Sequence, residues 1–84
     1  MEKLTDLPNI GPKLAENLEK IGVTTPGQLR ELGAEEAFLR IRAQVDGNAC
    51  LHQLEALAGA AEGVRKGLLS PERKAELKAW HRNL

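Results

Sequence analysis

A tight turn at residues 7–15 constrains the fold of this chain more than any other segment; it has the sequence Leu-Pro-Asn-Ile-Gly-Pro-Lys-Leu-Ala. Pro8 has a fixed φ and no amide hydrogen, and it disfavours helical backbone at the residue before it. Asn9 and Gly11 are residue types that readily enter the left-handed region, which permits a reversal around Ile10. The pattern predicts a hairpin that joins two helices.

The helix after this hairpin is predicted to run over residues 12–21. Pro12 suits the first helical position, where a missing amide hydrogen costs nothing. Apolar residues recur along one helical face, at Leu14, Leu18 and Ile21. The first turn of a helix leaves amide donors unpaired and carries a partial positive charge, to which Lys13 adds a full charge. Such a helix start is suited to a phosphate group.

Two further helix starts carry clear capping signals. Thr25 is placed as an N-cap, with Pro26 at the first helical position and Gln28 completing a capping box. Ser70 and Pro71 begin the last helix in the same way. That last helix should dock through apolar residues one or two turns apart, Leu77, Trp80 and Leu84.

Two more helices are predicted at residues 34–44 and 48–66. The second has an apolar pattern that includes the lone cysteine, Cys50, which we expect to be buried. It also has Gly59 and Gly63 in its interior, at a cost of about 0.8–1.0 kcal/mol each relative to alanine. A close approach of a neighbouring backbone is the expected reason for glycine there.

These elements predict one compact all-α domain of five helices over residues 1–84, of the SAM or helix-hairpin-helix type. Aromatic residues are limited to Phe38 and Trp80, so the core must consist of aliphatic residues and alanine. A chain of this size buries only about 60–65% of its unfolded surface, so its stability margin is narrow.

The net charge is zero, but the charge is unevenly distributed. From residue 65 onward six basic residues stand against two acidic ones, which gives +4 and leaves −4 on residues 1–64. Arg73 and Lys74 in this basic end are the candidates to support contact with nucleic acid. A nucleic-acid binder usually has a basic excess, because phosphate neutralisation supplies much of the affinity. A solvated helix face is the alternative explanation of the basic end.

No residues form a catalytic or cofactor-binding pattern. One cysteine excludes an internal disulfide and a cysteine-rich metal site. The two histidines, His52 and His81, are far apart and have no partner at metal-ligand spacing. No segment approaches the length of a membrane span or a secretory signal. We therefore expect no enzyme activity, no metal and no cofactor, and a cytoplasmic protein without a membrane partner.

The hairpin resembles a helix-hairpin-helix element, in which turn amides and a nearby lysine bind phosphate oxygens of DNA. By position, that resemblance assigns Asn9, Ile10, Gly11 and Lys13 to the contact, with Ile10 also packing inward. Asn9 stands where the element usually has glycine.

The whole chain resembles the C-terminal domain of the TfoX/Sxy family of bacterial competence regulators. The resemblance lies in residues 4–13, 22–23, 32–37, 54–60 and 69–77. It implies a role in DNA transformation competence and in transcription together with a partner activator. The family's usual α/β N-terminal domain has no counterpart in this sequence.

Two functions are therefore predicted, and the sequence leaves both open. The first is nucleic-acid-linked regulation in which the hairpin contacts a phosphate backbone. The second is a protein-interaction or structural domain in which the hairpin serves only as a turn, which the zero net charge favours. Nothing in the sequence fixes the oligomeric state.

Overall fold

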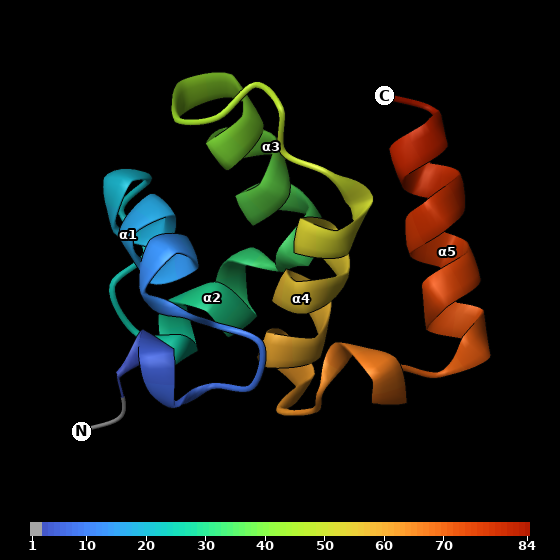
Figure 1. Cartoon of the computed structure of the whole chain (residues 1–84), viewed down its shortest axis with the longest axis horizontal. Coiled ribbons are helices and arrows are strands. Elements are labelled where there is room, and N and C mark those ends of the chain that lie inside the picture. The colour runs from blue at the N-terminus through green and yellow to red at the C-terminus, as the bar shows by residue number, and fades with distance from the viewer. Residues whose placement is uncertain (1–2) are drawn as a thin grey trace.

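The computed structural model describes residues 3–84, and helices are the only regular secondary structure over that range (Figure 1). The fold is the compact all-α domain of five helices that the sequence predicts. The helices are α1 (Pro12–Lys20), α2 (Pro26–Leu32), α3 (Ala34–Gln44), α4 (Leu51–Glu62) and α5 (Pro71–Arg82). Two 3₁₀ turns complete the chain, η1 (Leu4–Asp6) and η2 (Lys66–Leu68).

The predicted hairpin lies between η1 and α1. Asn9 is the one residue other than glycine with positive φ among the described residues, at 69°. Gly11 is the N-cap of α1, with Pro12 at its first position. A single 3₁₀ turn, η1, stands where a helix-hairpin-helix element has its first helix.

The capping predictions for α2 and α5 are confirmed. The Thr25 hydroxyl accepts a hydrogen bond from the Gln28 amide at 3.2 Å, and Gln28 Oε1 accepts one from the Thr25 amide at 3.2 Å. The Ser70 hydroxyl accepts from the Arg73 amide at 3.1 Å. These side chains satisfy amides that a helix start leaves without partners, and so they fix where α2 and α5 begin.

The prediction of one helix over residues 48–66 is wrong at both ends, since α4 covers only Leu51–Glu62. Gly63 ends the helix in the left-handed region, with φ of 77°, and its amide and that of Val64 bond back to Ala60 and Gly59. This is the usual glycine C-cap. Cys50 is the N-cap of α4 and is exposed, so its predicted burial is also wrong.

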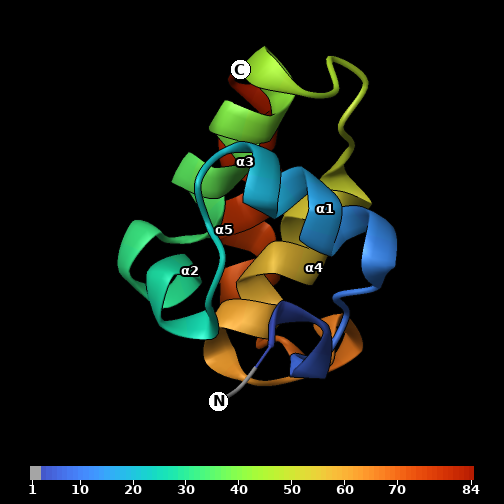
Figure 2. The same cartoon turned by 90° about the vertical axis from the view of Figure 1, so that its left-hand side faces the viewer.

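Helix α4 is the centre of the fold. Figure 1 shows it between the N-terminal helices and α5, and in Figure 2, which looks from the side of α1 and α2, α5 lies in the background. Its residues 56–60 are all buried. The largest fully buried side chains around it come from every long helix: Phe38, Leu18, Leu29, Ile41, Leu54, Leu57 and Leu77. The aliphatic core expected from the composition is therefore present.

Helix α5 is attached by a small apolar contact and an ionic cluster. Leu77 is buried, and the rings of Trp80 and Phe38 meet edge to face with centroids 6.0 Å apart. The predicted docking of Leu84 is wrong, because this residue lies beyond the last helical turn and is 46% exposed.

The ionic cluster surrounds Arg73 in the first turn of α5. Its two terminal nitrogens donate to the Glu35 carboxylate at 2.8 and 2.9 Å. One of them also donates to Glu76, and Glu62 lies 3.8 Å away. Hydrogen bonding to Glu35 raises the pKa of Arg73, and the same bond lowers the pKa of Glu35. The cluster thus joins α5 to α3 and to the end of α4.

We expect Arg73→Ala to lower the free energy of unfolding by about 1–3 kcal/mol, because it removes charge-assisted bonds and leaves three carboxylates close together. Urea denaturation measures this change. Lys78→Ala is the matched control, since Lys78 is an exposed residue of the same helix, and its effect should stay within about 0.5 kcal/mol. Equal stabilities of the two variants would show that the cluster does not hold α5.

Candidate nucleic-acid interface

The Asn9 side chain ties the hairpin to the segment that follows α4. Its amide nitrogen donates to the carbonyl oxygen of Val64 at 3.0 Å and to that of Ala56 at 3.4 Å. Its Oδ1 accepts from the Lys66 backbone amide at 3.0 Å. One side chain therefore satisfies backbone groups on both sides of residue 65, which lies more than 50 residues after Asn9 in the sequence. We call this set of bonds the Asn9 clamp.

The clamp is possible because Gly59 leaves room for it. A Cβ built on Gly59 would lie 2.6 Å from Asn9 Nδ2 and 2.7 Å from the Val64 carbonyl oxygen. No side chain fits at those distances. This confirms the expected close approach of a backbone at Gly59, whereas Gly63 is required for its left-handed conformation instead.

The start of α1 beside the clamp exposes free backbone donors. Gly11, Pro12 and Lys13 are exposed, and the first turn of α1 contains no acidic residue. Within residues 3–84 the amides of Gly11 and Lys13 have no hydrogen-bond acceptor. Ile10 differs from them, because its side chain is buried and its amide donates to the Leu7 carbonyl at 3.4 Å. The Gly11 and Lys13 amides and the Lys13 ammonium group are thus available to an anion.

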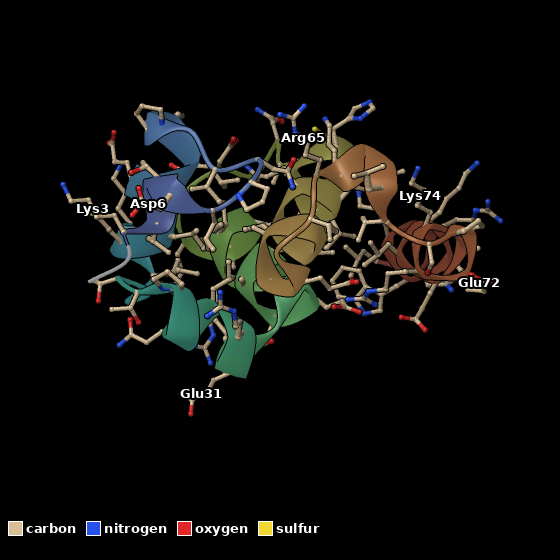
Figure 3. All side chains as sticks on the ribbon, turned by 90° about the horizontal axis from the view of Figure 1, so that it is seen from below. Lys3, Asp6, Glu31, Arg65, Glu72 and Lys74 are labelled. Atoms are coloured by element: carbon tan, nitrogen blue, oxygen red, sulfur yellow. The ribbon has the colours of Figure 1, made fainter. Side chains whose placement is uncertain are left out.

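The clamp brings two more basic residues to this helix start. Arg65 and Lys66 are exposed, and they stand beside Asn9 because Val64 and Lys66 are its bonding partners. Viewed from below, the hairpin, Arg65 and η2 follow one another along one edge of the molecule (Figure 3). We give the name hairpin edge to the hairpin with Lys13 together with Arg65 and Lys66, which lie next to Asn9.

The predicted supporting residues Arg73 and Lys74 lie elsewhere and point in different directions. Arg73 is surrounded by carboxylates on the α3 side of α5. Lys74 points in another direction, and its ammonium donates to the Gly67 carbonyl in η2 at 3.2 Å. Adjacent residues on a helix are about 100° apart, which explains the divergence. Lys74 thus borders the hairpin edge, whereas the charge of Arg73 is used inside the fold.

Arg65 and Lys66 belong to the basic end of the sequence, and the structure places them next to the Asn9 side chain. In the sequence they are more than 50 residues from the hairpin, at the end of the helix predicted over residues 48–66. The usable signal was the pairing of Asn9, at a usual glycine position, with Gly59, a glycine in a helix interior. Asparagine at the first position and glycine at the second are each unusual. Together they indicate that the asparagine side chain packs against the helix at the glycine.

Residues 1–81 match the TfoX C-terminal domain family. The chain belongs to this family. Protein Sxy of Escherichia coli strain K12 is 36% identical over 81 residues, which cover 94% of this chain and 37% of that protein. DNA transformation protein TfoX of Haemophilus influenzae is 32% identical over 88 residues, which cover 99% of this chain and 40% of that protein. The chain thus spans about two fifths of the length of these relatives.

Two solved structures share the fold of this TfoX C-terminal domain. Both are of a protein of unknown function from Listeria monocytogenes, in triclinic and tetragonal crystal forms. The triclinic form has a TM-score of 0.95 and 43% identity, covering 98% of this chain and 92% of the other. The tetragonal form has a TM-score of 0.91 and 44% identity, covering 95% and 96%. The arrangement described here is therefore shared with these two solved structures.

Other kinds of site find little support in the described part of the chain. Residues 3–84 contain no group of three or more His, Cys, Asp or Glu side chains placed to hold a metal ion. None of the helices in that range is both long and apolar enough to span a membrane. The hairpin edge is the surface that combines free donors with clustered charge.

Proposed function

We propose that this TfoX C-terminal domain is a non-enzymatic binding module that contacts the phosphate backbone of DNA through the hairpin edge. The observation that supports the proposal is the Asn9 clamp, which ties the segment of Arg65 and Lys66 to the same hairpin that carries the free amides of Gly11 and Lys13. The name of the Haemophilus relative, a DNA transformation protein, supports a role in DNA transformation competence. A link to transcription and a cytoplasmic location are further parts of the proposal.

The chemistry of this contact is simple. A phosphate oxygen at the start of α1 accepts hydrogen bonds from the Gly11 and Lys13 amides and is attracted by the positive end of the helix. Lys13, Arg65 and Lys66 then neutralise neighbouring phosphates. Such contacts carry no sequence information, so the affinity should be weak, independent of sequence and strongly dependent on salt. A protein of zero net charge can bind in this way because only the local surface is basic.

Gly11→Asp tests the proposal with little risk to the fold. Gly11 has φ of −90°, and a Cβ there meets no atom within 4 Å. Aspartate is a good N-cap, so α1 should keep or gain stability, while a carboxylate now occupies the phosphate site. We expect affinity for a short duplex at low salt to fall at least about tenfold.

Lys13→Ala should weaken binding to every duplex sequence and should reduce the slope of log K against log salt by about one unit. Lys78→Ala, on an exposed face of α5, is the matched charge control. Fluorescence anisotropy at several salt concentrations gives both quantities. If the unchanged domain shows no binding at low salt, or if Gly11→Asp and Lys13→Ala bind as well as the control, the DNA contact is refuted.

A protein-interaction domain is the second candidate, and the zero net charge is the observation that favours it. In that case the hairpin acts as a turn, and a partner such as a transcription activator binds another surface. A pull-down from lysate treated with nuclease separates the two functions. A protein retained after nucleic acid is digested, and released by a substitution remote from the hairpin edge, supports this second function.

A further inference from the structure

The most exposed large apolar side chain in the described structure is Leu68, and it lies next to the hairpin edge. It is 74% exposed, whereas its neighbour Leu69 is buried. In a 3₁₀ turn successive side chains point about 120° apart, so burying Leu69 turns Leu68 outward. Single exposed leucines are common on protein surfaces. The setting of Leu68 is what gives it significance.

The turn that carries Leu68 is held at several points. The Lys66 amide is bonded to Asn9 at 3.0 Å, and the Gly67 carbonyl accepts from Lys74 at 3.2 Å. Within the turn, the Leu68 amide donates to the Arg65 carbonyl at 2.8 Å. The backbone of Leu68 is therefore fixed relative to the hairpin. The exposure of its side chain is a property of an ordered turn and does not come from a flexible chain.

The charges around Leu68 indicate an anionic partner with an apolar interior. Arg65 and Lys66 of the hairpin edge precede it in sequence, and Lys74, which borders that edge, follows it. Two residues of 3₁₀ helix advance the chain by about 4 Å, so Leu68 stands close to the residue that Asn9 binds. Duplex DNA presents this combination, with phosphates along the strands and stacked bases between them. An apolar side chain inserted from the minor groove can enter a base step there.

We propose that Leu68 is a wedge that inserts between base pairs in the minor groove when the hairpin edge holds the flanking phosphates. This inference rests on the proposed function and names the form of its ligand, which is duplex DNA that is partly unstacked and bent. The hairpin edge fixes the position of the domain on the backbone, and Leu68 makes the contact with the bases. Flexible pyrimidine–purine steps, which unstack at least cost, should be preferred.

The test uses a short duplex with 2-aminopurine at a central flexible step, because this base becomes more fluorescent on unstacking. The unchanged domain should raise the fluorescence on binding. Leu68→Ala should bind about tenfold more weakly, because it lacks the apolar side chain that becomes buried between base pairs in the complex. It should also abolish the fluorescence rise. Its salt slope should equal that of the unchanged domain, because no phosphate contact is lost. Leu84→Ala removes the other exposed large apolar residue and is the matched control.

The outcomes separate the wedge from the phosphate contact. If Leu68→Ala binds and unstacks DNA like the Leu84→Ala control, the wedge is refuted while the phosphate contact stands. Insertion is also refuted if the unchanged domain binds the duplex without raising its fluorescence, even if Leu68→Ala binds more weakly. Binding to polyglutamate that depends on Leu68 as strongly as DNA binding would assign the residue to an acidic protein partner instead. Absence of DNA binding by the unchanged domain overturns the proposed function and the wedge together.

Discussion

Replacing Asn9 with alanine is expected to destabilise the domain by about 2–4 kcal/mol, a large share of the stability of a chain this small. Alanine tolerates the left-handed backbone of this position poorly. The substitution also leaves the Val64 carbonyl and the Lys66 amide without their partner. Urea denaturation measures the loss, and the melting temperature should fall by about 4–8 °C for each kcal/mol.

Two further substitutions at Asn9 separate the causes of that loss. Asn9→Gly keeps the backbone conformation and removes only the clamp, so its cost should be smaller than that of alanine, at about 1–3 kcal/mol. Asn9→Asp should cost more than glycine, because a carboxylate oxygen then faces the Val64 carbonyl. Asn48→Ala is the control, since Asn48 is exposed and its side chain makes no hydrogen bond among the described residues. If Asn9→Ala and Asn48→Ala are equally stable, there is no clamp.

Gly59→Ala is expected to lower stability by about 2–4 kcal/mol, although alanine is the better helix former by about 1 kcal/mol. The added Cβ would meet the Asn9 amide at 2.6 Å, the Val64 carbonyl at 2.7 Å and the Lys66 amide at 3.2 Å. Two of these three are backbone atoms, which cannot move without displacing the chain after α4. Overpacking of this kind costs about 1–3 kcal/mol, and the strained clamp adds to it.

Gly27→Ala is the matched control, because Gly27 also lies in a helix but has only the Thr25 hydroxyl near its Cβ position, at 4.0 Å. It should stabilise the domain by up to about 1 kcal/mol. The same substitution should therefore lower the free energy of unfolding at Gly59 and raise it at Gly27. In an Asn9→Gly background the cost of Gly59→Ala should shrink without vanishing, since the Val64 clash remains. Stabilisation by Gly59→Ala would contradict the close packing at this site.

The local features of the fold could be read from the sequence because they depend on a few neighbouring residues. Capping at Thr25 and Ser70 and the hairpin around Asn9 are set by side chains within three or four positions of each other. The five helices followed from apolar periodicity and from these signals. The end of α4 was missed, because Gly63 in a continuous apolar pattern can be either an interior residue or a left-handed cap.

The candidate interface was only partly predictable, because its second half comes from a tertiary contact. Gly11 and Lys13 follow directly from the hairpin. Arg65 and Lys66 join them only through the side-chain bonds of Asn9, and no local pattern encodes a pairing over more than 50 residues. Arg73 was chosen for its charge, and the carboxylates that neutralise it lie on other turns and helices.

An NMR titration of the isotopically labelled domain with a short DNA duplex tests the central claim most directly, because it reports on each backbone amide. At low salt we predict shifts concentrated in residues 9–14 and 65–68, led by the Gly11 and Lys13 amides, with little change in α2 and α3. Raising the salt concentration should remove them. Shifts absent from the Gly11 and Lys13 amides, or centred on α2 and α3, would contradict phosphate binding at the hairpin edge.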